Sequence, residues 1–149
     1  MNFNEFSDLA QRERMVRGST TITWRFLNAI KEYIQDSEIQ LFYLQGYLKN
    51  VNNKNRFTIY VFTDNKIIIF YENSDNDRLI SAKTYDYRYL QNIDLVLPEY
   101  FDTGDFRMTI LFQDQTSIML SSEEDANSEW VEFYNNNIKG IWDLLRRHS

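Results

Sequence analysis

The sequence predicts an α+β protein: a seven-stranded antiparallel bent β-barrel or sandwich, closed by a C-terminal amphipathic helix, with two additional N-terminal helices. Seven β-rich segments follow one another between Ile39 and Ser121, and amphipathic segments flank them on both sides. A chain of 149 residues with 43% apolar residues can bury the core of one domain. We expect a single domain over residues 1–149, with a helical extension over 1–36 and the barrel plus helix over 38–149.

Two helices are predicted before the strands. The first runs from about Asn4 to Val16, because its apolar residues recur at helical spacing and Gly18 stands where a C-terminal cap belongs. The second follows Ser19-Thr20-Thr21 and ends by Asp36-Ser37. Its apolar stripe is Ile22, Phe26, Ile30, Tyr33 and Ile34.

Turn residues divide the central region into seven strands. Asp64-Asn65 and Asp114-Gln115 each separate two apolar runs by two residues, which predicts two tight hairpins, the first with turn residues that tolerate a positive φ. Gly46 indicates a bend or bulge, and Pro98 ends a strand because it has no N–H to donate. The expected strands are Ile39–Leu48, Phe57–Thr63, Lys66–Glu72, Arg78–Tyr85, Tyr89–Leu97, Phe106–Gln113 and Thr116–Ser121.

The hairpin from Phe57 to Tyr71 is apolar on both of its faces. Ile59 and Val61 lie on one face, whereas Tyr60 and Phe62 lie on the other. A barrel has only one interior, so the second face must be covered by something else. The N-terminal helices are the expected cover, and a homodimer contact is the alternative.

A C-terminal core helix is predicted after the last strand. Ser121 or Ser122 can cap it, with Glu124 or Asp125 completing a capping box. Its polar face is not basic, which argues against a helix on a membrane surface. One continuous apolar stripe is expected from Trp130, Tyr134, Ile138, Ile141 and Leu145.

Seven strands followed by a Trp-containing amphipathic helix resemble the pleckstrin-homology-like (PH-like) superfamily, over about Ile39 to His148. The chain is similar to uncharacterised PH-like proteins of low-GC Gram-positive bacteria and their phages. The resemblance implies a small bent barrel that hosts lipid-binding, peptide-binding or architectural proteins. Acidic secretion chaperones are the rival architecture, but they place a helix between strands, and none is predicted here.

Composition argues against several kinds of site. The chain has no cysteine, its four glycines are scattered, and its single histidine, His148, lies next to the C-terminus. We therefore expect no cofactor, no metal site and no enzyme activity. Asp102-Thr103-Gly104 spells the tripeptide of aspartic proteases, but Asp105 follows where those enzymes carry a small residue. We interpret it as a turn, and a hydrolase built on Asp102 is the third hypothesis.

The charge pattern argues against nucleic acid as a partner. The net charge is −6, and ten acidic residues accompany the single Arg107 between Asn92 and Glu132. Phosphate backbones require Lys and Arg instead. No apolar run approaches the ~20 residues of a membrane span, and the N-terminus has no apolar region of a signal peptide. We expect a cytoplasmic protein without stable membrane binding.

The leading functional hypothesis is a non-catalytic PH-like module that binds an unidentified protein, with a second copy of the chain as one candidate. The resemblance places a bound peptide between the C-terminal helix and the strand Tyr89–Leu97. There, Arg88 and Arg107 can meet an acidic partner. Tyr60 and Phe62 are the apolar candidates for partner binding.

The alternative function is binding of an anionic phosphate or lipid headgroup. Lys49, Lys54 and Arg56 bracket the first long turn, similar to the basic pattern of phosphoinositide-binding PH domains. Three converging cations can hold a phosphate. This hypothesis predicts salt-sensitive binding to liposomes that is lost when the three residues become alanine.

Overall fold

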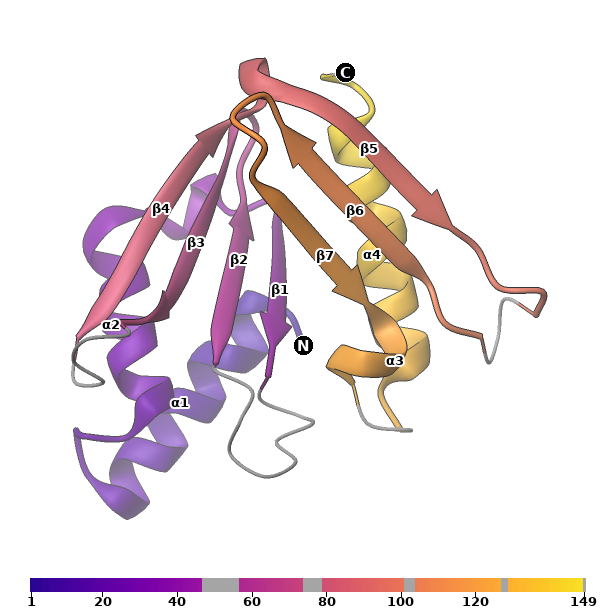
Figure 1. Cartoon of the computed structure of the whole chain (residues 1–149). Helices are drawn as coiled ribbons and strands as arrows, with labels where there is room; N and C mark the ends of the chain where they lie inside the picture. Colours follow the sequence, from indigo (N-terminus) through magenta and orange to yellow (C-terminus); the bar gives the residue numbers. More distant parts are fainter. Residues whose placement is uncertain (47–56, 74–78, 101–103, 127–128, 149) are drawn as a thin grey trace.

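Two antiparallel sheets form the body of the protein, seen in a computed structural model that describes residues 1–46, 57–73, 79–100, 104–126 and 129–148 (Figure 1). The first sheet has the order β1-β2-β3-β4 and the second the order β5-β6-β7. No strand pairing joins the two sheets in these ranges, so the seven strands are confirmed and a closed barrel is not. Their bounds are Leu41–Gln45, Thr58–Phe62, Lys66–Glu72, Ile80–Asp86, Leu90–Val96, Arg107–Phe112 and Ser117–Ser121.

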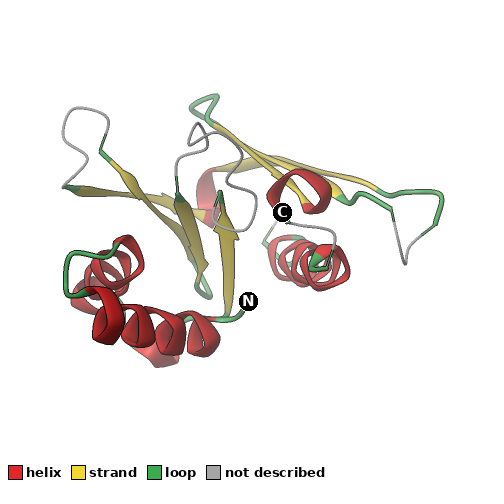
Figure 2. Cartoon of the chain, turned by 90° about the horizontal axis from the view of Figure 1, so that it is seen from below, coloured by secondary structure: helices red, strands yellow, loops and turns green. Residues whose placement is uncertain are grey.

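The two predicted N-terminal helices are confirmed as α1 (Phe3–Arg17) and α2 (Ile22–Tyr33), followed by a 3-10 turn, η1 (Asp36–Glu38). Both helices lie against one face of the first sheet (Figure 2). The Asn2 side chain caps α1 by accepting from the backbone N–H of Glu5 at 2.8 Å. Gly18 ends the helix as predicted, with a φ of 95° that favours glycine.

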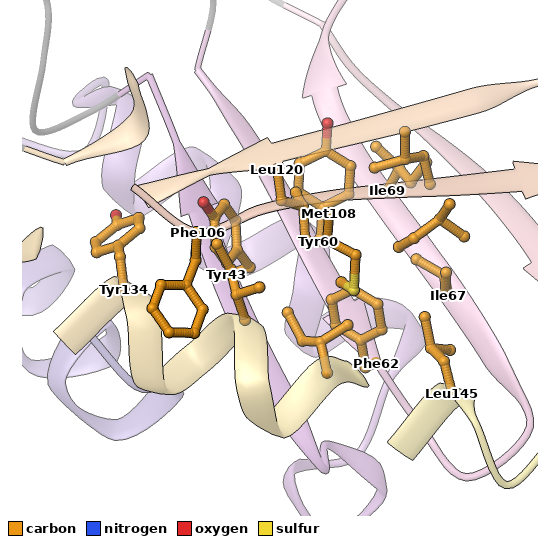
Figure 3. Close-up of a cluster of buried hydrophobic side chains, with 14 of the residues drawn as sticks. Tyr43, Tyr60, Phe62, Ile67, Ile69, Phe106, Met108, Leu120, Tyr134 and Leu145 are labelled. Atoms are coloured by element: carbon orange, nitrogen blue, oxygen red, sulfur yellow. The ribbon is translucent and has the colours of Figure 1, made fainter. Parts of the chain in front are cut away.

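Both faces of the β2–β3 hairpin are buried within the chain. Ile59 and Val61 pack with the apolar side chains of α1 and α2, which confirms the predicted cover. Tyr60 and Phe62 point the other way, into a core shared with the second sheet and the C-terminal helix (Figure 3). Tyr60 is 8% exposed and Phe62 is 0% exposed. Neither side chain therefore presents surface to a partner in this structure.

The two predicted hairpin turns are present, but only the second contains a residue with a positive φ. Thr63 donates its N–H to the Lys66 carbonyl at 3.0 Å, and its hydroxyl accepts from the Lys66 N–H at 3.2 Å. The expected positive φ is absent from Asp64-Asn65. Among the non-glycine residues that the structure describes, only Gln115, in the second turn, has a positive φ, of 73°.

The predicted single C-terminal helix is two helices, α3 (Ser122–Asp125) and α4 (Val131–Leu145). The Ser121 cap belongs to the short α3, because its hydroxyl accepts from the Glu124 N–H at 3.2 Å. The extended backbone of Ala126 then ends α3. The predicted stripe of α4 is buried at Tyr134, Ile138, Ile141 and Leu145.

The strands run between two ends of the molecule, which we call the turn end and the loop end. The turn end holds the β2–β3 turn, the β6–β7 turn and a 3-10 turn, η2 (Tyr87–Tyr89), at the top of Figure 1. The loop end holds Gln45, Val96 and α3. In the described part of the chain, no helix is both long enough and apolar enough to cross a membrane.

Candidate functional site

A buried polar network joins the two sheets at the loop end. The Tyr43 hydroxyl donates to Asp125 Oδ2 at 2.6 Å, and Gln45 Nε2 donates to Asp125 Oδ1 at 3.2 Å. The Ser121 N–H donates to Asp125 Oδ2 at 3.0 Å, and the Tyr60 hydroxyl donates to Gln45 Oε1 at 3.0 Å. In the described part of the chain no strand pairing connects β1 with β7, and these hydrogen bonds join the two sheets beside the shared apolar core.

The electrostatics of the network point to a structural clamp. Burial raises the pKa of Asp125 above its ordinary value of 3.8, although the donors from Ser121, Tyr43 and Gln45 lower it. Burial, reinforced by the Asp125 charge, raises the pKa of Tyr60 to about 12, so this hydroxyl remains a donor. The buried Asp125 carboxylate accepts hydrogen bonds from three donors and so links the two sheets. Sequence reasoning missed this network, since it considered Asp125 only as an alternative to Glu124 in a capping box.

The raised pKa of Asp125 predicts a pH dependence of stability. Folding favours the protonated form of Asp125 over the ionised form, relative to the unfolded chain. This preference adds to the free energy of unfolding below pH 3.8, and the added stability is lost as pH rises through the pKa of the folded state. We expect the stability advantage of wild type over Asp125→Asn to shrink as pH rises from about 4 to 7. Urea unfolding of both proteins at several pH values measures this difference. A difference that is constant with pH would contradict the assignment.

Gly104 and Asp105 have structural roles at the loop end. A side chain on Gly104 would collide with Pro98, so close packing requires a glycine. Asp105 Oδ1 accepts from the Ser121 hydroxyl at 2.9 Å and from the Glu123 N–H at 3.0 Å, and Asp105 also pairs with Arg107. These bonds hold the start of α3.

Several predicted site residues fall outside the described residues. They are Asp102 with Thr103, and the three cations Lys49, Lys54 and Arg56. Headgroup binding through these three cations stays a prediction, and salt-sensitive binding to anionic vesicles tests it. Within the described residues, no three His, Cys, Asp or Glu side chains are grouped as ligands for a metal ion.

Arg88 and Arg107 lie at opposite ends of β5. Arg88 belongs to η2, and η2 directly precedes the first residue of β5, Leu90. Arg107 is opposite Val96, the last residue of β5, in the β5–β6 register. Six steps of an extended strand separate these ends by about 20 Å. Arg88 pairs with Asp86 at 3.1 Å and keeps most of its side chain exposed. The two arginines therefore cannot hold one acidic group, but both can flank an extended segment.

The strand between the two arginines is an edge of its sheet. β5 pairs with β6 on one side, and the described part of the chain provides no strand on its other side. An edge strand presents backbone N–H and C=O groups without ladder partners. Apolar side chains are exposed where β5 ends: Val96 is 61% exposed and Tyr100 is 70% exposed, with Leu97 between them also exposed.

Comparison with known proteins identifies the family. The model of the family described as "Protein of unknown function (DUF3908)" matches residues 5–136. No curated protein matches the sequence. Solved structures that this chain matches include a DUF1696 family protein with a pleckstrin-homology domain from Shewanella loihica PV-4, with a TM-score of 0.47 and 12% identity, over 84% of this chain and 91% of that one. A pleckstrin homology domain from Shewanella amazonensis SB2B has a TM-score of 0.43 and 14% identity, over 93% of this chain and 96% of that one. Because the family model spans most of the sequence, the chain belongs to the DUF3908 family.

Proposed function

We propose that the protein is a non-catalytic module that binds an extended segment of another protein along the free edge of β5. The observation that carries this proposal is the seven-residue strand Leu90–Val96, which pairs on one side only within the described part of the chain and ends in exposed apolar side chains. A segment that adds to a sheet edge gains main-chain hydrogen bonds, and neighbouring side chains select its sequence.

The surroundings of β5 define the segment that would fit. Val96, Leu97 and Tyr100 offer apolar contacts at the loop end. Arg88 at the turn end pairs with one carboxylate, Asp86, and keeps most of its side chain exposed. Arg107 pairs with Asp105, lies 3.9 Å from Glu124 and is less exposed. The preferred segment is therefore an extended one of about seven residues, with an acidic residue near Arg88 and apolar residues at the other end.

A library of random displayed peptides tests the proposal, by selection on the immobilised protein. Selected peptides should bind at least about tenfold more weakly to the double variant Val96→Asp/Leu97→Asp, because a bound apolar side chain would meet new carboxylates. Met15→Asp is the matched control, since Met15 is exposed on α1, which packs against the first sheet. Equal binding to wild type and to the double variant would contradict the proposal.

A second copy of the chain is the competing occupant of the same edge. Sedimentation equilibrium distinguishes it from a foreign segment. A wild-type dimer that becomes a monomer in Val96→Asp/Leu97→Asp would show that β5 serves self-association, which would overturn binding of another protein at this edge.

A further inference from the structure

A groove with an aromatic floor lies at the turn end, with a volume of about 520 Å³. Its two walls come from the end of β4 with η2 and from the β6–β7 turn. The Gln113 N–H donates to the Tyr89 carbonyl at 2.8 Å, so a hydrogen bond fixes one wall to the other. The lining residues are Thr84, Tyr85, Asp86, Tyr89, Phe112, Gln113 and Asp114.

The aromatic side chains of this groove favour a cation. The Tyr85 ring stacks on the Phe112 ring with 4.7 Å between centroids and 27° between planes. The Tyr89 ring is more than half exposed at the rim. The face of an aromatic ring carries negative potential and attracts ammonium and guanidinium groups.

Two carboxylates on opposite walls add to this preference. Asp86 Oδ1 accepts from the Arg88 N–H at 2.9 Å, and Asp114 Oδ1 accepts from the Thr116 N–H at 2.9 Å. These hydrogen bonds to the charged form lower the pKa of both side chains below 3.8, so both are ionised at neutral pH. Anionic ligands are disfavoured here for the same reason.

Arg88 shows that a cation can contact two of the lining side chains at once, although Arg88 does not itself line the groove. Its Nη2 lies 3.1 Å from Asp86 Oδ2, and its guanidinium carbon lies 5.6 Å from the centroid of the Tyr89 ring. One cation of the chain itself thus meets a carboxylate and an aromatic face of the groove together. In the described part of the chain, Asp114 on the other wall forms no ion pair.

We propose that this groove binds the cationic side chain of a lysine or arginine presented by a partner protein. The inference goes beyond binding at the β5 edge, because the groove is built from β4, η2 and the β6–β7 turn. Charge complementarity and the exposed aromatic surface favour this occupant. Arg88 competes with it for Asp86 and Tyr89.

Titration of the ¹⁵N-labelled protein tests the proposal, with N-acetyl-arginine methylamide and N-acetyl-lysine methylamide as probes. The amides of Tyr85, Tyr89 and Gln113 should show saturable shifts by about 10 mM, the range expected for a single side chain. The citrulline analogue is the matched control ligand, since it keeps the shape of arginine without its charge. Equal shifts with citrulline, or no saturable shift with either cation, would overturn the proposal.

Variants distinguish arginine binding in the groove from a general effect of negative surface charge. Asp114→Asn should weaken arginine binding about fivefold, and it keeps the Oδ1 acceptor that the Thr116 N–H uses. Asp8→Asn removes the same charge from an exposed position on α1 and should leave binding unchanged. Arg88→Gln should strengthen binding about threefold, because the internal competitor is gone. Equal weakening by Asp8→Asn and Asp114→Asn would overturn the proposal. None of these readouts depends on a segment bound at β5.

Discussion

Replacing Asp125 with alanine is expected to lower the free energy of unfolding by about 3 kcal/mol. The carboxylate accepts hydrogen bonds from Tyr43, Gln45 and Ser121 in a buried site, and alanine leaves these donors without an acceptor. Part of the loss is offset because a buried charge is also removed. Urea unfolding followed by tryptophan fluorescence measures the change.

The matched control for Asp125 is Asp143, an acidic residue on the exposed side of α4 that pairs with Arg146 at 3.2 Å. Asp143→Ala should change the unfolding free energy by no more than about 0.5 kcal/mol, since exposed ion pairs contribute little. An Asp125→Ala variant as stable as this control would show that apolar packing alone holds the two sheets together.

Replacing Phe62 with alanine is expected to cost about 4 kcal/mol of unfolding free energy. Its ring is fully buried between the first sheet, the second sheet and α4, so truncation leaves a cavity that the surrounding core fills only in part (Figure 3). A loss of this size lowers the melting temperature by about 10 °C for a domain of this length. Thermal unfolding by circular dichroism measures it.

Met119→Ala is the control for Phe62, because Met119 lies on the exposed face of β7. Its effect should stay within about 0.5 kcal/mol. If Phe62→Ala had an equally small effect, the Phe62 side chain would be on a surface, and the β2–β3 hairpin would again be a candidate partner-binding face.

Short-range patterns in the sequence predicted most elements of the fold. The apolar stripes of α1 and α2, the alternation along β6 and the two-residue turns are all short-range signals, and the elements that they predict are present. The split into two sheets has no such signal, because it depends on whether β1 and β7, which lie far apart in the sequence, pair with each other. The break between α3 and α4 was missed because the sequence prediction joined the Ser121 or Ser122 cap directly to the apolar stripe that begins at Trp130, whereas the extended backbone of Ala126 ends α3.

The candidate site was less predictable than the fold. Tyr43 and Asp125 are 82 residues apart in sequence, and only the tertiary structure brings them together. The apolar side chains of Tyr60 and Phe62 were visible in the sequence, but periodicity alone cannot tell an internal second core from a binding surface. The groove residues were missed because β4, η2 and the β6–β7 turn meet only after the sheets pack.

Hydrogen exchange of the β5 amides, with and without a peptide selected on the protein, tests the proposed function most directly. A bound segment that adds to the edge should slow the exchange of amides between Leu90 and Val96 while those of α1 keep their rates. Unchanged exchange along β5, with protection of another element instead, would contradict binding at this edge.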